Sequence, residues 1–192
     1  LAHAVAKIPK GEDMNQEQSQ VFDDPYRLPR HALPTRYDLR LEPDLVSATF
    51  QGRTTIALTV LVSTTVIVLN ALELTVESAA TEDEQGRRLS ASIGMDESLQ
   101  RCRLTFSQSM APGEWRLHMM FRGALNDTLR GFYRSTYKDQ TGTTQTMAAT
   151  QFEATDARRA FPCWDEPDFK AVFSTTVVID KTLTAVSNSV VL

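Results

Sequence analysis

The sequence predicts an all-β domain of antiparallel strands in stacked sheets or a sandwich, with one short helix. Apolar and polar residues alternate with a period of two in several runs, which is typical of strands that bury one face. Proline is absent between Pro43 and Pro112, where this alternation is strongest. Turn-forming sequences separate the runs, and β-branched residues are frequent within them. Together these observations favour several strands joined by short turns.

The expected strands follow one another along the chain. In the first, Arg36–Glu42, the apolar residues Tyr37, Leu39 and Leu41 alternate with charged ones. After Gly52 the pattern returns at Ile56, Leu58, Val60 and Val62. The remaining expected strands are Val66–Leu69, Gln100–Phe106, Glu114–Arg122 and Lys170–Asp180. Turn signals fall at Asp83–Gly86, Pro112-Gly113 and Gln140–Gly142.

One segment is predicted to be helical, Ala154–Ala160. Thr155 or Asp156 can cap its first turn with a side-chain oxygen. Pro162 ends the helix, because proline lacks an N–H and disfavours helical backbone at the residue before it.

Charge and hydropathy exclude several classes of partner. The chain has 192 residues with 20 Lys+Arg against 24 Asp+Glu, and so a net charge of −4. No basic cluster suits a nucleic acid or an anionic membrane surface. No run approaches the ~18–20 apolar residues of a membrane span. We therefore expect no nucleic acid and no membrane as partner.

Metal and thiol chemistry also find little support. The three histidines, His3, His31 and His118, are scattered and form no H-E-x-x-H motif. Cys102 lies on an apolar strand face and is interpreted as a small buried hydrophobe. Cys163 has no histidine nearby in sequence to act as its base, so a thiol nucleophile is not expected. We predict that both cysteines are reduced and that this chain holds no metal ligands.

The first 27 residues are predicted to be a disordered arm before a domain at residues 28–192. Residues 1–13 have no apolar run of the kind that a signal peptide needs. Since the chain does not begin with methionine and Met14 precedes a plausible native start, residues 1–13 are interpreted as added or upstream sequence. Asn15–Asp24 is interpreted as a polar mobile arm. Without a readable signal peptide, the expected localisation is cytoplasmic.

The segment Thr150–Phe173 contains the best candidate binding residues. In an extended Gln151-Phe152-Glu153, the strand period places Gln151 and Glu153 on one face and Phe152 on the other. With Phe152 anchored in the core, a carboxylate and a carboxamide remain side by side. Such a pair can receive a cationic amine, because the carboxylate supplies charge and the amide adds an acceptor. The same pattern fits an ordinary solvated strand face, and the residues alone leave both interpretations open.

Two adjacent carboxylates, Asp165 and Glu166, precede Pro167 in the same segment. They suit either a catalytic carboxylate pair or a hard-cation site. The alternative is a structural role as capping groups or partners of Arg158 and Arg159. We favour the structural role, because two carboxylates are a poor coordination shell for Ca²⁺.

An ordered set of motifs makes the chain recognisable between Leu28 and Leu192. The motifs are Leu33-Pro34-x-x-Tyr37-Asp38-Leu39-x-Leu41-x-Pro43-Asp44, Phe50-x-Gly52, Leu69-Asn70-Ala71, Gly131-Phe132-Tyr133-Arg134-Ser135, Gln151-Phe152-Glu153, Phe161-Pro162-Cys163-Trp164-Asp165-Glu166-Pro167, Lys170-Ala171-x-Phe173 and the final Asn188 strand. In this order and at these intervals they resemble the N-terminal domain of the aminopeptidase N family, the zinc-dependent gluzincin aminopeptidases.

The resemblance implies a large saddle-shaped β domain that covers the active site of a following thermolysin-like domain. In the family, the acidic or amide residue two positions after the glutamine contacts the free α-amine of the peptide substrate. Those positions match Gln151 and Glu153, so the resemblance assigns both to substrate binding. An α-amine exists only at a chain terminus, and a correctly placed Glu153 would therefore make the enzyme an exopeptidase.

The family's catalytic motifs are absent from this chain. G-x-M-E-N and H-E-x-x-H with its downstream glutamate, which supply the zinc ligands and the general base, do not occur. The resemblance implies a parent metallo-aminopeptidase with zinc as cofactor. Its implied partners are the peptide N-terminus and the downstream catalytic domain of the same polypeptide. We expect the 192-residue chain alone to bind no catalytic zinc and to be inactive. Two alternatives are a non-catalytic β-rich interaction module and a relative of the bifunctional epoxide hydrolases.

Overall fold

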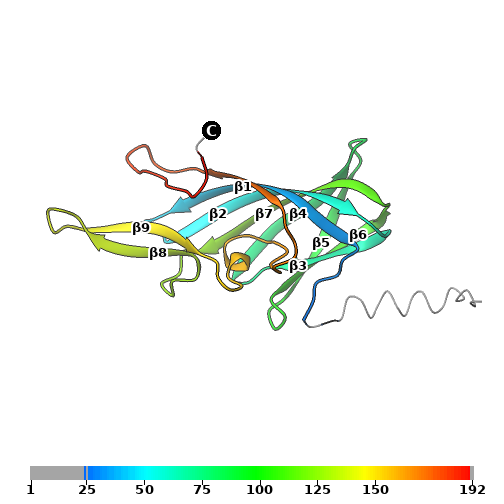
Figure 1. Ribbon diagram of the computed structural model, residues 1–192, viewed down its shortest axis with the longest axis horizontal. Helices are drawn as coiled ribbons and strands as arrows, with labels where there is room; N and C mark the ends of the chain where they lie inside the picture. The colour runs from blue at the N-terminus through cyan, green and yellow to red at the C-terminus, as the bar shows by residue number, and fades with distance from the viewer. Residues whose placement is uncertain (1–23, 25, 191–192) are drawn as a thin grey trace, which may run out of the picture.

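The computed structural model describes residues 24 and 26–190, and this part of the chain is almost entirely β-structure (Figure 1). The strands are β1 (Ala32–Asp44), β2 (Thr49–Val60), β3 (Thr64–Asn70), β4 (Leu74–Asp83), β5 (Arg88–Asp96), β6 (Arg101–Met110), β7 (Gly113–Ala124), β8 (Gly131–Lys138), β9 (Thr144–Gln151) and β10 (Val172–Val177). One short 3-10 helix, η1, covers Ala157–Arg159. The predicted all-β fold class is confirmed.

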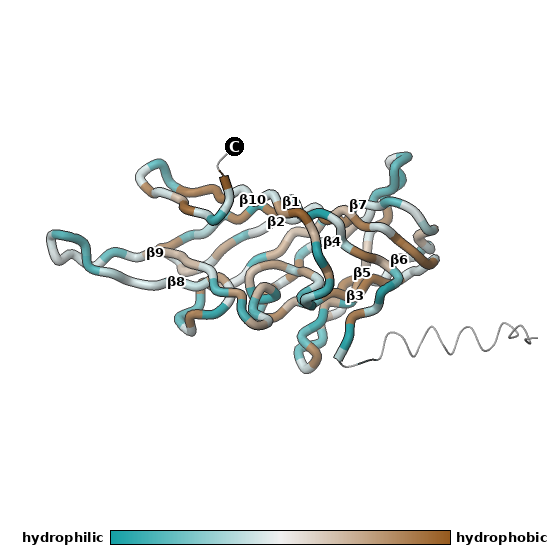
Figure 2. Tube along the Cα trace, viewed as in Figure 1, coloured by the Kyte–Doolittle hydropathy of each residue, from teal (hydrophilic) through white to brown (hydrophobic). Residues whose placement is uncertain are grey.

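Eight of the strands form one large sheet in the order β10-β1-β2-β7-β4-β5-β6-β3. Strand β5 pairs with β4 only through Arg88–Ser90 and with β6 from Ala91 onward, which makes β5 the corner of the sheet. Apolar side chains from both sides of this corner belong to one buried core. Strands β8 and β9 form a separate hairpin that projects beyond one end of the large sheet (Figure 1). The far tip of this hairpin is hydrophilic (Figure 2).

Burial follows the predicted alternation in the central strands. In β2, Ile56 and Leu58 are fully buried, whereas the intervening Ala57 is partly exposed. The neighbouring β7 repeats this pattern with Leu117 and Phe121 on the buried face. Burying one such large side chain contributes about 1.5–3 kcal/mol. A strand with apolar residues at every second position therefore turns that face toward the core.

The expectation of purely antiparallel pairing is wrong for β10. This strand pairs parallel to β1, with Arg36 opposite Val172 and Leu41 opposite Val177. Parallel neighbours need a long crossover connection, and most of the domain lies between these two strands in sequence. As an edge strand, β10 leaves Val172, Phe173 and Val177 exposed.

The predicted helix is shorter than expected. Residues 154–156 belong to a turn in which the Asp156 N–H donates to the Phe152 carbonyl at 2.9 Å, so only Ala157–Arg159 remains helical. Asp156 occupies the N-cap position, but its side chain makes no capping hydrogen bond, and the predicted cap is wrong. Its carboxylate instead accepts hydrogen bonds from two arginines.

Other differences concern strand ends and strands without clear alternation. Strand β2 ends at Val60 rather than Val62, because the Leu61 N–H donates to the His31 carbonyl and leads the chain away. Strands β4, β5 and β9 were not predicted, since their burial patterns depart from a strict period of two.

Two glycines in β2 and β7 face aromatic rings across the strand pair. Gly52 lies opposite Phe121, and Phe50 lies opposite Gly123. A Cβ atom on Gly52 would lie 2.3 Å from Cζ of Phe121, and one on Gly123 would lie 2.5 Å from Cζ of Phe50. Each ring therefore covers the space that the opposite glycine leaves open.

Replacing Gly52 with alanine is expected to lower the free energy of unfolding by about 1–3 kcal/mol, because the new methyl group must displace a buried ring. Urea denaturation of the 192-residue chain measures the loss. Gly94→Ala in β5 is the matched control, since a Cβ there meets nothing closer than 3.9 Å. A loss for Gly52→Ala no larger than for Gly94→Ala would contradict the packing argument.

His31 links the start of β1 to β3. Its Nε2 lies 2.7 Å from the carbonyl oxygen of Val66, and because a carbonyl only accepts, this nitrogen carries the proton. Burial lowers the pKa of His31 from its ordinary 6.5, and the hydrogen bond to Val66 offsets only part of that effect. The folded domain therefore favours the neutral ring.

The lowered pKa predicts a pH dependence of stability. Below pH 6.5 the unfolded chain binds a proton at His31 more readily than the folded chain does, so the free energy of unfolding falls with decreasing pH. We expect His31→Gln to reduce this dependence relative to the unmodified chain. Urea denaturation between about pH 7.5 and pH 5.5 tests this. An unchanged pH dependence in the variant would remove His31 as its source.

Candidate functional site

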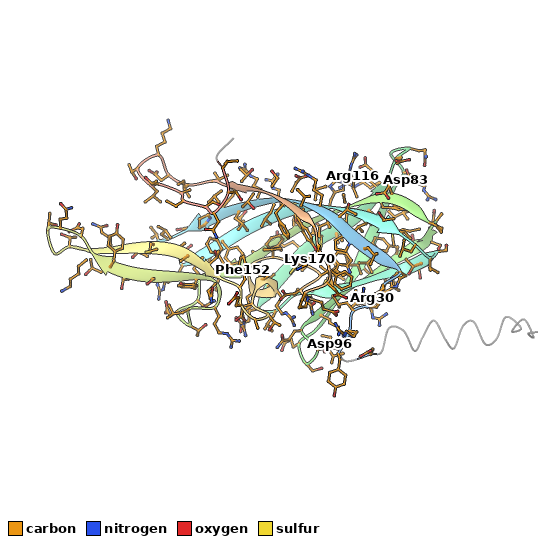
Figure 3. All side chains as sticks on the ribbon, in the orientation of Figure 1. Arg30, Asp83, Asp96, Arg116, Phe152 and Lys170 are labelled. Carbon is orange, nitrogen blue, oxygen red and sulfur yellow. The ribbon has the colours of Figure 1, made fainter. Side chains whose placement is uncertain are left out.

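The candidate site lies where the β8–β9 hairpin meets the body of the domain. Gly131 at the start of β8 pairs with Gln151 at the end of β9. Phe152, the next residue, packs partly buried against the core, with its ring centroid 5.9 Å from that of Phe161. Figure 3 labels Phe152 at this junction. Its anchoring fixes the chain on both sides and leaves Gln151 and Glu153 exposed, as the alternation predicts.

Glu153 lies in the turn that follows β9, and the peptide bond joining it to Ala154 is cis. The turn is closed by the hydrogen bond from the Asp156 N–H to the Phe152 carbonyl. Within the described part of the chain, the side chains of Gln151 and Glu153 make no hydrogen bond or ion pair. Both are therefore available to an external ligand.

Asp156, the carboxylate nearest to Glu153 in sequence, is buried and paired with arginines. The Asp156 side chain is 4% exposed, and its two oxygens accept hydrogen bonds from Arg130 Nε and Arg159 Nε, each at 2.9 Å. Burial acts to raise the pKa of Asp156, but the hydrogen bonds from these arginines outweigh it and the pKa lies below its usual value. Asp156 is thus a buried, fully ionised anchor.

The remaining acidic residues of the segment are also paired with arginines. Asp165 accepts from Arg158 Nε at 2.8 Å. Glu166 pairs with Arg27 at 3.3 Å and accepts from the Leu28 N–H, while Asp168 pairs with Arg30. A structural role is therefore confirmed for both carboxylates. Asp165 has the expected partner Arg158, whereas Glu166 pairs with Arg27 rather than with Arg158 or Arg159. Among the described carboxylates between residues 150 and 170, only Glu153 lacks one.

A second network ties the segment to the large sheet. Arg158 Nη1 donates to Gln100 Oε1 at 3.0 Å, and the Asp165 N–H donates to Asn70 Oδ1 at 3.2 Å. Asn70 and Cys163 exchange backbone hydrogen bonds of 2.8 and 3.0 Å. These contacts connect the ends of β3 and β6 to the segment that follows Glu153, and so give that segment a defined position.

The described residues do not provide a metal site. Within residues 24 and 26–190, no group of three or more His, Cys, Asp or Glu side chains is placed to hold a metal ion. Cys102 and Cys163 are free and buried, and burial raises the pKa of Cys102 to about 12 and that of Cys163 above its usual value. The donor set of this part of the chain therefore does not fit a zinc ion.

The segments described by the structure contain no helix with the length and hydropathy of a transmembrane span.

Several residues around the site were not singled out in the sequence. Arg130, directly before β8, binds Asp156, and Glu73, directly before β4, pairs with Arg159. The available signals were Gly131, which opens the motif Gly131-Phe132-Tyr133-Arg134-Ser135, and the positive charge of Arg130. Neither signal indicates a particular partner, because the contacts join parts of the chain that are distant in sequence.

The fold and the site together define a β-rich domain that presents the unpaired Glu153 carboxylate in a turn whose ends are held by the hairpin. The family model of the peptidase M1 N-terminal domain matches residues 33–192. The chain therefore belongs to the peptidase M1 N-terminal domain family, and the resemblance inferred from its motifs is confirmed.

Individual relatives agree with this assignment. Aminopeptidase M1-D of Oryza sativa subsp. japonica is 46% identical over 162 residues, which cover 84% of this chain and 18% of the relative. Aminopeptidase M1 of Arabidopsis thaliana is 45% identical over 166 residues, covering 84% and 19%. Puromycin-sensitive aminopeptidase of Caenorhabditis elegans is 42% identical over 163 residues, covering 84% and 17%. The chain thus spans less than a fifth of the length of these relatives.

Proposed function

We propose that this domain is the part of a zinc-dependent aminopeptidase that receives the free α-amine of a peptide substrate, at Glu153 with Gln151 beside it. The observation that carries the proposal is the exposed Glu153 carboxylate, which has no partner within the described residues although its acidic neighbours all pair with arginines. The names of the relatives, all aminopeptidases, support the same substrate class.

The chemistry of the pair suits an amino terminus. An α-amine with its ordinary pKa of about 7.7–8.0 is largely protonated at neutral pH, and it offers N–H donors and a positive charge. Glu153 accepts charge-assisted hydrogen bonds from that ammonium group, and the Gln151 amide oxygen adds a neutral acceptor. A peptide bond within a chain carries no such charge. The pair therefore selects chain ends over internal positions.

Hydrolysis itself is assigned to the remainder of the complete polypeptide. Zinc, which polarises the scissile carbonyl and activates water in such enzymes, finds no three-residue donor group in the described part of this chain. We therefore propose that the 192-residue chain binds and orients the amine end of a substrate but is inactive alone.

Blocking the substrate amine tests this function. In the complete polypeptide, N-acetylation of a peptide substrate is expected to lower kcat/KM about 30-fold or more, because the acetyl group removes the charge that Glu153 binds. Steady-state kinetics with the free and acetylated forms of one peptide measure the ratio. Equal turnover of the two peptides would contradict amine recognition. No peptidase activity in the complete polypeptide would favour the interaction module instead.

A further inference from the structure

Two consecutive residues hold both ends of the turn that carries Glu153. Gly131 pairs with Gln151 immediately before the turn. Arg130 binds Asp156 immediately after it, with 2.9 Å between Arg130 Nε and Asp156 Oδ2. The turn is thus fastened at its two ends to one point of the hairpin.

Gly131 also allows η1 to approach the hairpin closely. It has a φ of +69°, and a Cβ atom there would lie 2.5 Å from Cβ of Arg159 and 3.2 Å from the carbonyl oxygen of Asp156. Only glycine combines this backbone conformation with such a contact at little cost. The close approach brings Arg159 and Arg130 to the same carboxylate, that of Asp156.

The two guanidinium groups differ in their other contacts. Arg159 pairs with Glu73 as well as with Asp156. For the Arg130 guanidinium, Asp156 is the partner that the structure shows among the described residues. Gly131 pairs with Gln151, so Arg130 lies beside the strand end from which Glu153 follows two residues later. Without the negative charge of Asp156, Arg130 would lose its partner close to the exposed Glu153 carboxylate, which has none among the described residues. An internal ion pair between them would then compete with a substrate amine.

We propose that Asp156 is a positioning residue for amine recognition, which fixes the turn that bears Glu153 and keeps Arg130 from neutralising the Glu153 carboxylate. This inference rests on the proposed function, in which Glu153 binds the α-amine. Asp156 itself contacts no substrate. It acts by holding the turn that bears Glu153 in place and by pairing with Arg130.

The test uses steady-state kinetics of the complete polypeptide with a peptide that has a free amino terminus. Asp156→Asn is expected to raise KM at least tenfold while kcat changes less than threefold, since the freed Arg130 competes with the substrate for Glu153. Adding Arg130→Gln is expected to return KM to within about threefold of the unmodified enzyme, because the competing cation is gone. A double variant as impaired as Asp156→Asn would overturn the proposal, because its KM would then be raised although no competing cation remains.

A matched control separates this effect from general loss of a surface charge pair. Arg134 Nε binds Asp127 at 2.6 Å in the same hairpin region, and among the described residues no hydrogen bond or ion pair joins either side chain to the turn. Asp127→Asn is expected to leave KM within about twofold, since exposed pairs contribute little. A tenfold rise in KM for this control would overturn the assignment to Asp156.

Two further outcomes keep the proposal distinct from the proposed function. If Glu153→Gln leaves KM unchanged, the proposed function fails, and the inference fails with it. If Glu153→Gln raises KM but Asp156→Asn does not, only the inference is overturned. If Asp156→Asn does not fold, the double variant still decides, because it leaves no unpaired Arg130; a tenfold rise in its KM would contradict the proposal.

Discussion

Replacing Glu153 with alanine in the complete polypeptide is expected to lower kcat/KM for peptides with a free amino terminus. The decrease corresponds to a loss of about 2–5 kcal/mol of transition-state stabilisation. The carboxylate is exposed and has no partner within the described residues, so it can offer both oxygens to an incoming ammonium group. Its loss leaves the substrate charge without a counter-ion in the bound state. The isosteric Glu153→Gln tests the charge alone and is expected to show a large part of the same loss.

Two controls accompany this measurement. Turnover of an N-acetylated peptide should be insensitive to Glu153→Ala, because that substrate lacks the amine. Glu84→Gln replaces another exposed glutamate, in the turn after β4, and is expected to leave the kinetics unchanged. Its neighbour Asp83 lies at the end of the molecule remote from Phe152 in Figure 3. Unchanged kinetics in Glu153→Ala would remove this residue from the site.

Replacing Asp165 with alanine is expected to lower the free energy of unfolding of the 192-residue chain by about 3–5 kcal/mol. The side chains of Arg158 and Asp165 are only 12% and 14% exposed, and their contact is 2.8 Å long. Removing the carboxylate leaves a buried guanidinium without its counter-charge, with Gln100 and the Asp165 carbonyl as its remaining acceptors. Urea denaturation, with the midpoint and slope both recorded, measures the loss.

The exposed pair of Arg36 and Asp38 provides the comparison. Their side chains are 47% and 52% exposed, and their contact of 2.7 Å is as short as the buried one. Asp38→Ala is expected to cost at most about 1 kcal/mol, because water already screens both charges. Similar losses for Asp38→Ala and Asp165→Ala would show that burial does not determine how much the pair of Arg158 and Asp165 contributes to the free energy of unfolding.

Much of the fold could be predicted because strands that bury one face have apolar residues at alternate positions, and this pattern is visible in the sequence. Ile56, Leu58 and Leu117 lie on buried faces where the alternation places them. The shortened helix shows the limit of such reasoning. Capping of Ala154–Ala160 by Asp156 was a sound expectation from neighbouring residues, but Arg130 is a stronger partner than the backbone N–H groups and comes from 26 residues away.

The candidate site, too, could be predicted only in part. Alternation around Phe152 predicts that Gln151 and Glu153 point away from the core, and both are exposed. The sequence also placed Arg158 and Arg159 near several carboxylates. It contained no sign that Glu166 and Asp168 pair with Arg27 and Arg30, whose positions differ by 139 and 138 residues.

By itself, the sequence determined the β-rich fold class, the family and the identity of the two candidate binding residues. The fold class follows from periodicity, a property of neighbouring residues, whereas the family and the two candidate residues follow from the resemblance carried by the ordered motifs. Only the tertiary structure decided that β10 runs parallel to β1 and that, among the described carboxylates between residues 150 and 170, Glu153 is the one left without an arginine. Charge pairing depends on which distant segments the fold brings within about 4 Å of each other, and the pattern of neighbouring residues does not predict which segments these are.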